Sequence, residues 1–106
     1  MKIFCSYFLL VSILFSKNIY AANDIVVSQK AKAFSADSIE ISVGDSIVFK
    51  NDDETSHNVF SVTVDQNFNG GITKPGAEIR RKFDVPGELE VRCAIHPKMK
   101  LKIKVK

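Results

Sequence analysis

The sequence predicts an all-β protein with one small domain, an antiparallel sandwich or a small barrel. Apolar residues alternate with polar ones at a period of two in several short runs that are rich in Val, Ile and Phe. Turn-forming residues separate these runs, and no long stripe of apolar residues has helical spacing. Short strands with regular turn signals are typical of sandwiches and barrels.

The first 22 residues predict an export signal. Lys2 gives a basic start, residues 3–15 form an apolar run of thirteen residues, and Ala21 and Ala22 are small residues suited to cleavage. The apolar run is shorter than the roughly 20 residues that a membrane-spanning helix needs. We therefore expect cleavage, no stable membrane insertion afterwards, and a periplasmic location for the remaining domain, 23–106.

Removing 22 of the 106 residues leaves 84, which is enough for one domain and not for two. The signal contains two lysines and no acid, so 13 of the 15 basic residues remain against 12 acidic ones. This balance, without an aromatic-rich basic surface, argues against a nucleic-acid partner. We expect a monomer.

The strands are expected in a regular order along the mature chain. Gly44-Asp45 is interpreted as the turn of a hairpin between the second and third runs. Asn51-Asp52-Asp53, Asn69-Gly70-Gly71, Lys74-Pro75-Gly76 and Pro86-Gly87 are interpreted as further turns. The expected strands cover residues 25–28, 38–43, 46–49, 58–64, 78–83, 89–93 and 99–105.

The last predicted strand has the clearest pattern. Met99, Leu101, Ile103 and Val105 face one side, which we assign to the core, and lysines at the positions between them face the other. We interpret the lysine side as a solvated face, which also discourages edge-to-edge pairing.

The mature chain contains four soft metal ligands and no spare ones: His57, Cys93, His96 and Met99. Cys93 has no cysteine to pair with in an oxidising compartment, so metal ligation is a reason for its presence. Three of the four lie within the seven residues from Cys93 to Met99. A thiolate and two imidazoles with a distant thioether form the ligand set of a blue-copper site.

The mixed ligand set suits both oxidation states of copper. Sulfur favours Cu(I) and nitrogen favours Cu(II), and an intermediate geometry limits rearrangement during electron transfer. A strand that ends at Cys93, followed by a turn closed by Pro97, can return His96 and Met99 toward one point. His57 lies 36 residues before Cys93, at the start of another predicted strand, so the fold must bring it to this loop.

The segments 51–60 and 93–99 resemble the two copper-binding segments of the cupredoxins, and the gap between His96 and Met99 resembles the short ligand loop of amicyanin. The resemblance implies a Greek-key sandwich of two sheets holding one copper ion. It implies binding through Nδ1 of His57 and His96, through the sulfur of Cys93, and axially through Met99. Asn58 matches a position that steadies the ligand loops, although it can equally be an ordinary strand start.

The favoured function is one-electron transfer between a donor and an acceptor redox protein, with His96 as the exit and Pro97 in the docking patch. Such a carrier is not an enzyme. Copper sequestration or delivery is the alternative, although the chain has no histidine-rich or methionine-rich tract. A cysteine hydrolase using Cys93 lacks an evident orienting carboxylate, and zinc does not usually take methionine as a ligand.

Overall fold

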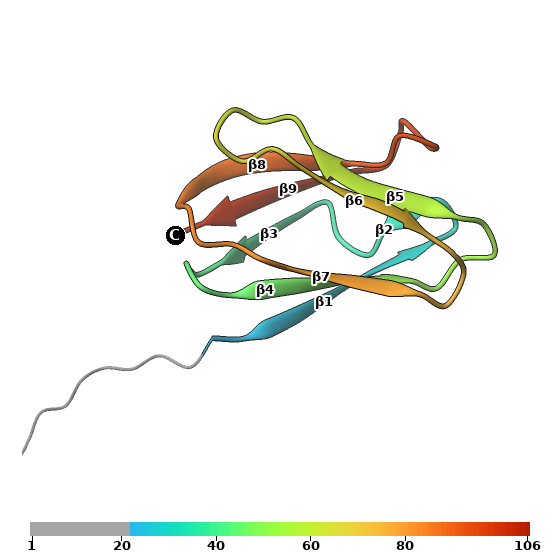
Figure 1. The fold of residues 1–106 in the computed structure, drawn as a ribbon, viewed down its shortest axis with the longest axis horizontal. Helices are drawn as coiled ribbons and strands as arrows, with labels where there is room; N and C mark the ends of the chain where they lie inside the picture. The colour runs from blue at the N-terminus through green and yellow to red at the C-terminus, as the bar shows by residue number, and fades with distance from the viewer. Residues whose placement is uncertain (1–21) are drawn as a thin grey trace, which may run out of the picture.

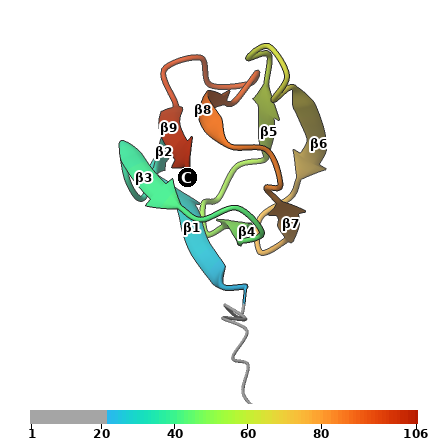
Figure 2. The ribbon, with the colours of Figure 1, turned by 90° about the vertical axis from the view of Figure 1, so that its left-hand side faces the viewer.

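The computed structural model describes residues 22–106, which form nine strands in two facing sheets (Figures 1 and 2). In this part of the chain there is no helix, and so none that is long and apolar enough to cross a membrane. The expected signal lies almost entirely outside the described residues. The strands are β1 (Asp24–Lys30), β2 (Ala33–Phe34), β3 (Ser38–Ile41), β4 (Ser46–Asn51), β5 (His57–Ser61), β6 (Phe68–Thr73), β7 (Glu78–Lys82), β8 (Gly87–Arg92) and β9 (Lys100–Val105).

The sheet order confirms the expected Greek-key sandwich. One sheet has the order β2-β1-β4-β7, and the other has the order β3-β9-β8-β5-β6. Neighbours along the chain are therefore often separated in space. The sheets are not purely antiparallel as predicted, because β1 pairs with β4, and β3 with β9, in parallel. The connections that cross between the sheets place these strands side by side in the same direction.

The predicted hairpin at Gly44-Asp45 is wrong, because β3 and β4 lie in different sheets. The Asp45 carboxylate accepts the Ser42 backbone N–H at 2.8 Å, which closes a tight corner. Gly44 has a φ of 96° and donates its N–H to Phe83 O at 2.8 Å. At this corner the chain therefore crosses from one sheet to the other. Which sheet each strand joins depends on pairing partners that are distant in the sequence.

The prediction of a turn at Asn69-Gly70-Gly71 is also wrong, because these residues belong to the edge strand β6. A Cβ on Gly70 would collide with Ile79 Cδ1 and lie 3.1 Å from Val59 O. Glycine therefore permits a close approach between β6 and its neighbours here. The short strand β2 was not predicted either.

The strand predicted over residues 58–64 ends earlier, since β5 stops at Ser61. The Ser61 hydroxyl accepts the Thr63 N–H at 3.2 Å, and Asp65 has a φ of 65°. A turn therefore follows Ser61. Val62 and Val64, which the alternation assigned to a strand, are 76% and 82% exposed.

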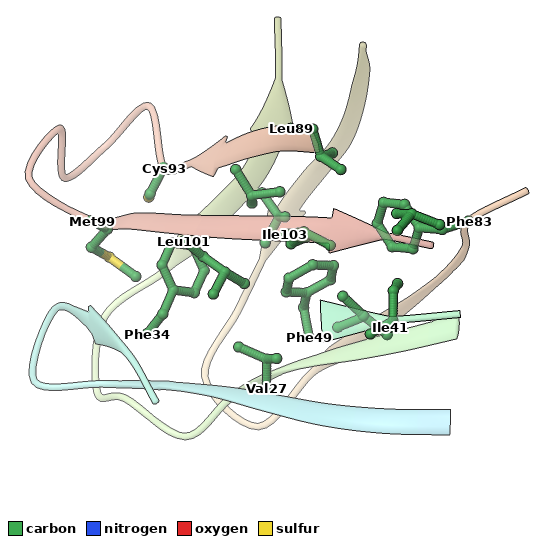
Figure 3. Close-up of a cluster of buried hydrophobic side chains, with 14 residues drawn as sticks. Val27, Phe34, Ile41, Phe49, Phe83, Leu89, Cys93, Met99, Leu101 and Ile103 are labelled. Atoms are coloured by element: carbon green, nitrogen blue, oxygen red, sulfur yellow. The ribbon is translucent and has the colours of Figure 1, made fainter. Parts of the chain in front are cut away.

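The core lies between the sheets, and the expected inward face of the last strand is confirmed. Met99, Leu101, Ile103 and Val105 are all buried, while the intervening lysines are exposed. Figure 3 shows side chains from both sheets meeting in this layer. Full burial of a large aliphatic or aromatic side chain contributes roughly 1.5–3 kcal/mol. The remaining core residues are Val27, Phe34, Ile41, Ile47, Phe49, Val59, Phe83, Leu89, Val91 and Cys93.

The first residue of β5 and the loop that joins β8 to β9 lie at the same end of the sandwich, on the right in Figure 1. The C-terminus lies at the opposite end. This arrangement brings His57 to the loop that contains Cys93 and His96.

Candidate metal centre

His57 is the first residue of β5, and its side chain is completely buried. Its Nδ1 lies 3.8 Å from the sulfur of Cys93 and 3.1 Å from Nδ1 of His96. The second ring nitrogen, Nε2, points to the carboxylate of Asp53. The ring therefore presents Nδ1 to the predicted site.

Cys93 directly follows β8 and is 1% exposed. Its sulfur lies 3.9 Å from Nδ1 of His96 and accepts the backbone N–H of Asn58 at 3.3 Å. This hydrogen bond fixes the sulfur beside the start of β5. The donor atoms of His57, Cys93 and His96 all lie within 4.8 Å of one another.

His96 lies in the turn between β8 and β9 and is partly exposed. Its carbonyl oxygen accepts the Met99 N–H at 3.0 Å, which closes the turn. Ala94, Ile95, Pro97 and Lys98 are exposed around it. The turn thus carries a histidine whose Nδ1 faces the buried thiol while its neighbours face solvent.

Met99 lies one residue before β9 and is 2% exposed. Figure 3 shows its side chain extending from just before the start of β9 into the space between the sheets. Met99 thus lies at the same end of the sandwich as Cys93. Met99 is not among the three residues whose donor atoms lie within 4.8 Å of one another. Its side chain is part of the hydrophobic core.

Asn58 joins the two ligand segments, as its resemblance to a loop-steadying position implied. Its Oδ1 accepts the Ala94 N–H at 3.2 Å, and its Nδ2 donates to Asn69 Oδ1 at 3.0 Å and to Gly71 O at 3.1 Å. This one side chain therefore connects β5, β6 and the start of the ligand turn.

Asp53 was not identified from the sequence as part of the site. Its Oδ2 lies 2.9 Å from His57 Nε2 and also accepts the Lys32 backbone N–H at 2.9 Å. Its Oδ1 accepts the Glu54 N–H at 2.8 Å. The Lys32 N–H, then the His57 side chain and the Glu54 N–H, hold the pKa of the Asp53 carboxyl well below its usual range. Asp53 is therefore a carboxylate at neutral pH.

The three donor atoms fit one metal ion. Atoms bonded to a first-row metal at about 2.0–2.3 Å, and spread around it, lie roughly 3.3–4 Å apart. The separations of 3.1, 3.8 and 3.9 Å are close to this range. One thiolate and two imidazoles match the trigonal ligands of blue-copper centres, in which a methionine is the weak axial ligand.

Comparison with known proteins also indicates copper binding. Residues 21–106 match the family model described as copper binding proteins of the plastocyanin/azurin family. No curated protein matches the chain.

Solved structures share the fold. A purple cupredoxin from Nitrosopumilus maritimus is 24% identical with a TM-score of 0.70, and the match covers 77% of this chain and 99% of that one. A reduced amicyanin variant is 25% identical with a TM-score of 0.72, over 77% of this chain and 81% of amicyanin. A copper-containing nitrite reductase from Thermus scotoductus is 25% identical with a TM-score of 0.74, over 90% of this chain and 25% of that one.

The match to the family model covers every strand, and the two-sheet fold is that of the cupredoxin structures. The chain therefore belongs to the plastocyanin/azurin family of copper-binding proteins.

Proposed function

We propose that the protein is a periplasmic one-electron carrier, not an enzyme, and that its copper ion is bound by His57, Cys93, His96 and Met99. The observation that supports this proposal most strongly is the convergence of two imidazole Nδ1 atoms and a buried thiol within 4.8 Å. Bound copper would supply the redox chemistry by alternating between Cu(II) and Cu(I).

The protein contributes a rigid ligand frame. His57 is held by β5, Cys93 by the end of β8, and Met99 by the start of β9. The sandwich therefore restricts each of these positions. Two hydrogen bonds restrict the ligand turn further: the Asn58 backbone N–H donates to the Cys93 sulfur, and the Ala94 N–H donates to Asn58 Oδ1. A site that moves little between oxidation states requires little reorganisation, which favours fast electron transfer.

Electrons would enter and leave near the exposed side of His96. A shallow hollow there is lined by Lys32, Ile95, His96, Pro97 and Lys98, and Ile95 is 46% exposed. A hollow whose lining combines the apolar Ile95 and Pro97 with two lysines suits brief docking of a donor or acceptor redox protein. The protein would act as a monomer.

We also propose that residues 1–22 are a cleaved export signal and that 23–106 form the copper domain. The first strand begins at Asp24, so cleavage after Ala22 would leave every strand intact. The Asn23 backbone nitrogen donates to the Asp45 carboxylate at 3.1 Å. Cleavage at this position would turn that nitrogen into a charged amino group, which the carboxylate would bind more strongly.

The test is to express the full chain with its leader and purify the protein from the periplasmic fraction. Mass spectrometry is expected to show a chain beginning at Asn23. After addition of Cu(II), we expect an intense visible thiolate-to-copper band and reversible one-electron voltammetry. Bound copper without this band would favour storage or delivery. A chain that binds no copper would contradict the proposal.

Substitutions of Met99 distinguish its proposed role as a copper ligand from its role as a core side chain. Met99→Gln is expected to lower the reduction potential, because an amide oxygen stabilises Cu(II) relative to Cu(I). Met99→Leu keeps the volume and is expected to raise the potential while costing less than about 1.5 kcal/mol of stability. Voltammetry and urea unfolding measure the two effects. Unchanged potentials in both variants would leave Met99 with only its core role.

A further inference from the structure

Asp53 makes an unusual set of contacts for a surface-loop acid. Its side chain is only 13% exposed, and the imidazole that it contacts is fully buried. One oxygen, Oδ2, serves both His57 Nε2 and the Lys32 N–H, each at 2.9 Å. The carboxylate therefore lies between the predicted ligand His57 and the exposed turn that joins β1 to β2.

This contact determines which nitrogen of His57 carries the proton. An ionised carboxylate can only accept hydrogen bonds, so the contact requires a proton on Nε2. In the neutral ring, Nδ1 then has a free lone pair, directed toward Cys93 and His96. Asp53 thereby selects the tautomer that a metal at Nδ1 needs.

The β1–β2 turn holds Asp53 in place. Ala31 and Lys32 both have left-handed φ angles, 53° and 58°, which non-glycine residues adopt at a cost. The Lys32 N–H is directed at Asp53 Oδ2 by this conformation. In addition, the Asp53 N–H donates to Asn51 Oδ1 at 2.9 Å, and Asn51 is completely buried.

Resting on the proposed copper site, we infer that Asp53 is a positioning residue that orients His57 and lowers the reduction potential of the centre. A fixed negative charge one imidazole away from the metal favours the more positive ion, Cu(II). The effect is strong because the pair is shielded from water. Asp53 is not one of the proposed ligands, and acts through His57.

Asp53→Asn is the informative variant because it separates charge from geometry. With its amide oxygen in the place of Oδ2, asparagine can still accept from His57 and from Lys32, and loses only the bond to Glu54. The charge is removed while the ring stays oriented. Glu54→Gln is the matched control, since it removes the same charge from the adjacent, exposed residue.

We expect Asp53→Asn to keep the visible band and to shift the one-electron equilibrium about tenfold toward Cu(I), which corresponds to about 59 mV. Glu54→Gln is expected to shift it far less, because solvent and salt screen an exposed charge. Equal shifts in the two variants would overturn the inference that Asp53 tunes the site.

A second measurement needs no copper. Long-range ¹H–¹⁵N NMR spectra of the metal-free protein are expected to show His57 protonated at Nε2 in the wild type and in Asp53→Asn. Observation of the proton on Nδ1 alone in the wild type would overturn the positioning role. This result does not depend on whether the protein carries electrons. Failure of the positioning role can therefore be distinguished from failure of the proposed function.

Discussion

Replacing Cys93 by serine is expected to abolish the intense visible absorption and the reversible voltammetry of the copper-loaded protein. The band requires a thiolate bonded to copper, and serine has no thiolate to offer. The fold should survive, because the side chains have similar sizes and the Asn58 N–H, 3.3 Å from the sulfur, can also donate to a hydroxyl. Visible absorption spectroscopy and voltammetry measure the loss directly.

Copper affinity should also fall in Cys93→Ser, by more than about 100-fold, since even residues that only support ligands change it by 10–100-fold. Ala94→Ser is the matched control: it adds a hydroxyl at the next position, where the side chain is exposed, and should keep the band. A persistent band in Cys93→Ser would place the chromophore elsewhere and contradict the proposed ligand set.

The four candidate ligands could be selected from the sequence because their chemistry is rare in this chain. After Ala22 the sequence contains two histidines, one cysteine and one methionine, so few other sets were available. The structure brings His57, Cys93 and His96 together across a separation of 36 residues between the first two. Residue type and spacing thus carried most of the information on the site.

The strand pairing was harder to predict, because it depends on partners that are distant in sequence. The alternation around Gly44-Asp45 correctly indicates two strands, yet β3 pairs with β9, and β4 pairs with β1 and β7. Local patterns describe which face of a strand is apolar and not which neighbour it chooses. In β6 the glycines resemble a turn. The close approach of Ile79 and Val59 explains Gly70, and a φ of 79° explains Gly71.

Asp53 shows the same limit at the site itself. Three consecutive acids, Asp52, Asp53 and Glu54, precede His57, and nothing in their order distinguishes the middle one. The backbone of the loop turns Asp53 inward, while Asp52 and Glu54 remain exposed. The four-residue spacing between Asp53 and His57 brings the two side chains into contact only because the loop has this conformation.

Asn58→Ala is expected to destabilise the metal-free protein by about 2–4 kcal/mol, which urea unfolding can measure. Three side-chain hydrogen bonds are lost, at roughly 0.5–1.5 kcal/mol each. They connect Asn58 to Ala94, Asn69 and Gly71. The bond from the Asn58 backbone N–H to Cys93 does not depend on the side chain and should remain.

The bond to Ala94 gives this variant a second effect, on the metal site. Without it the ligand turn is held less firmly beside β5, so copper affinity should fall by about 10–100-fold, as is usual for residues that support ligands. Asn69→Ala is the matched control, because it removes one of the two bonds between Asn58 and β6 and leaves the Ala94 bond intact. It should lose some stability and keep its copper affinity. Equal affinities in Asn58→Ala, Asn69→Ala and the wild type would mean that Asn58 supports the sheet alone and that the ligand turn holds its shape without it.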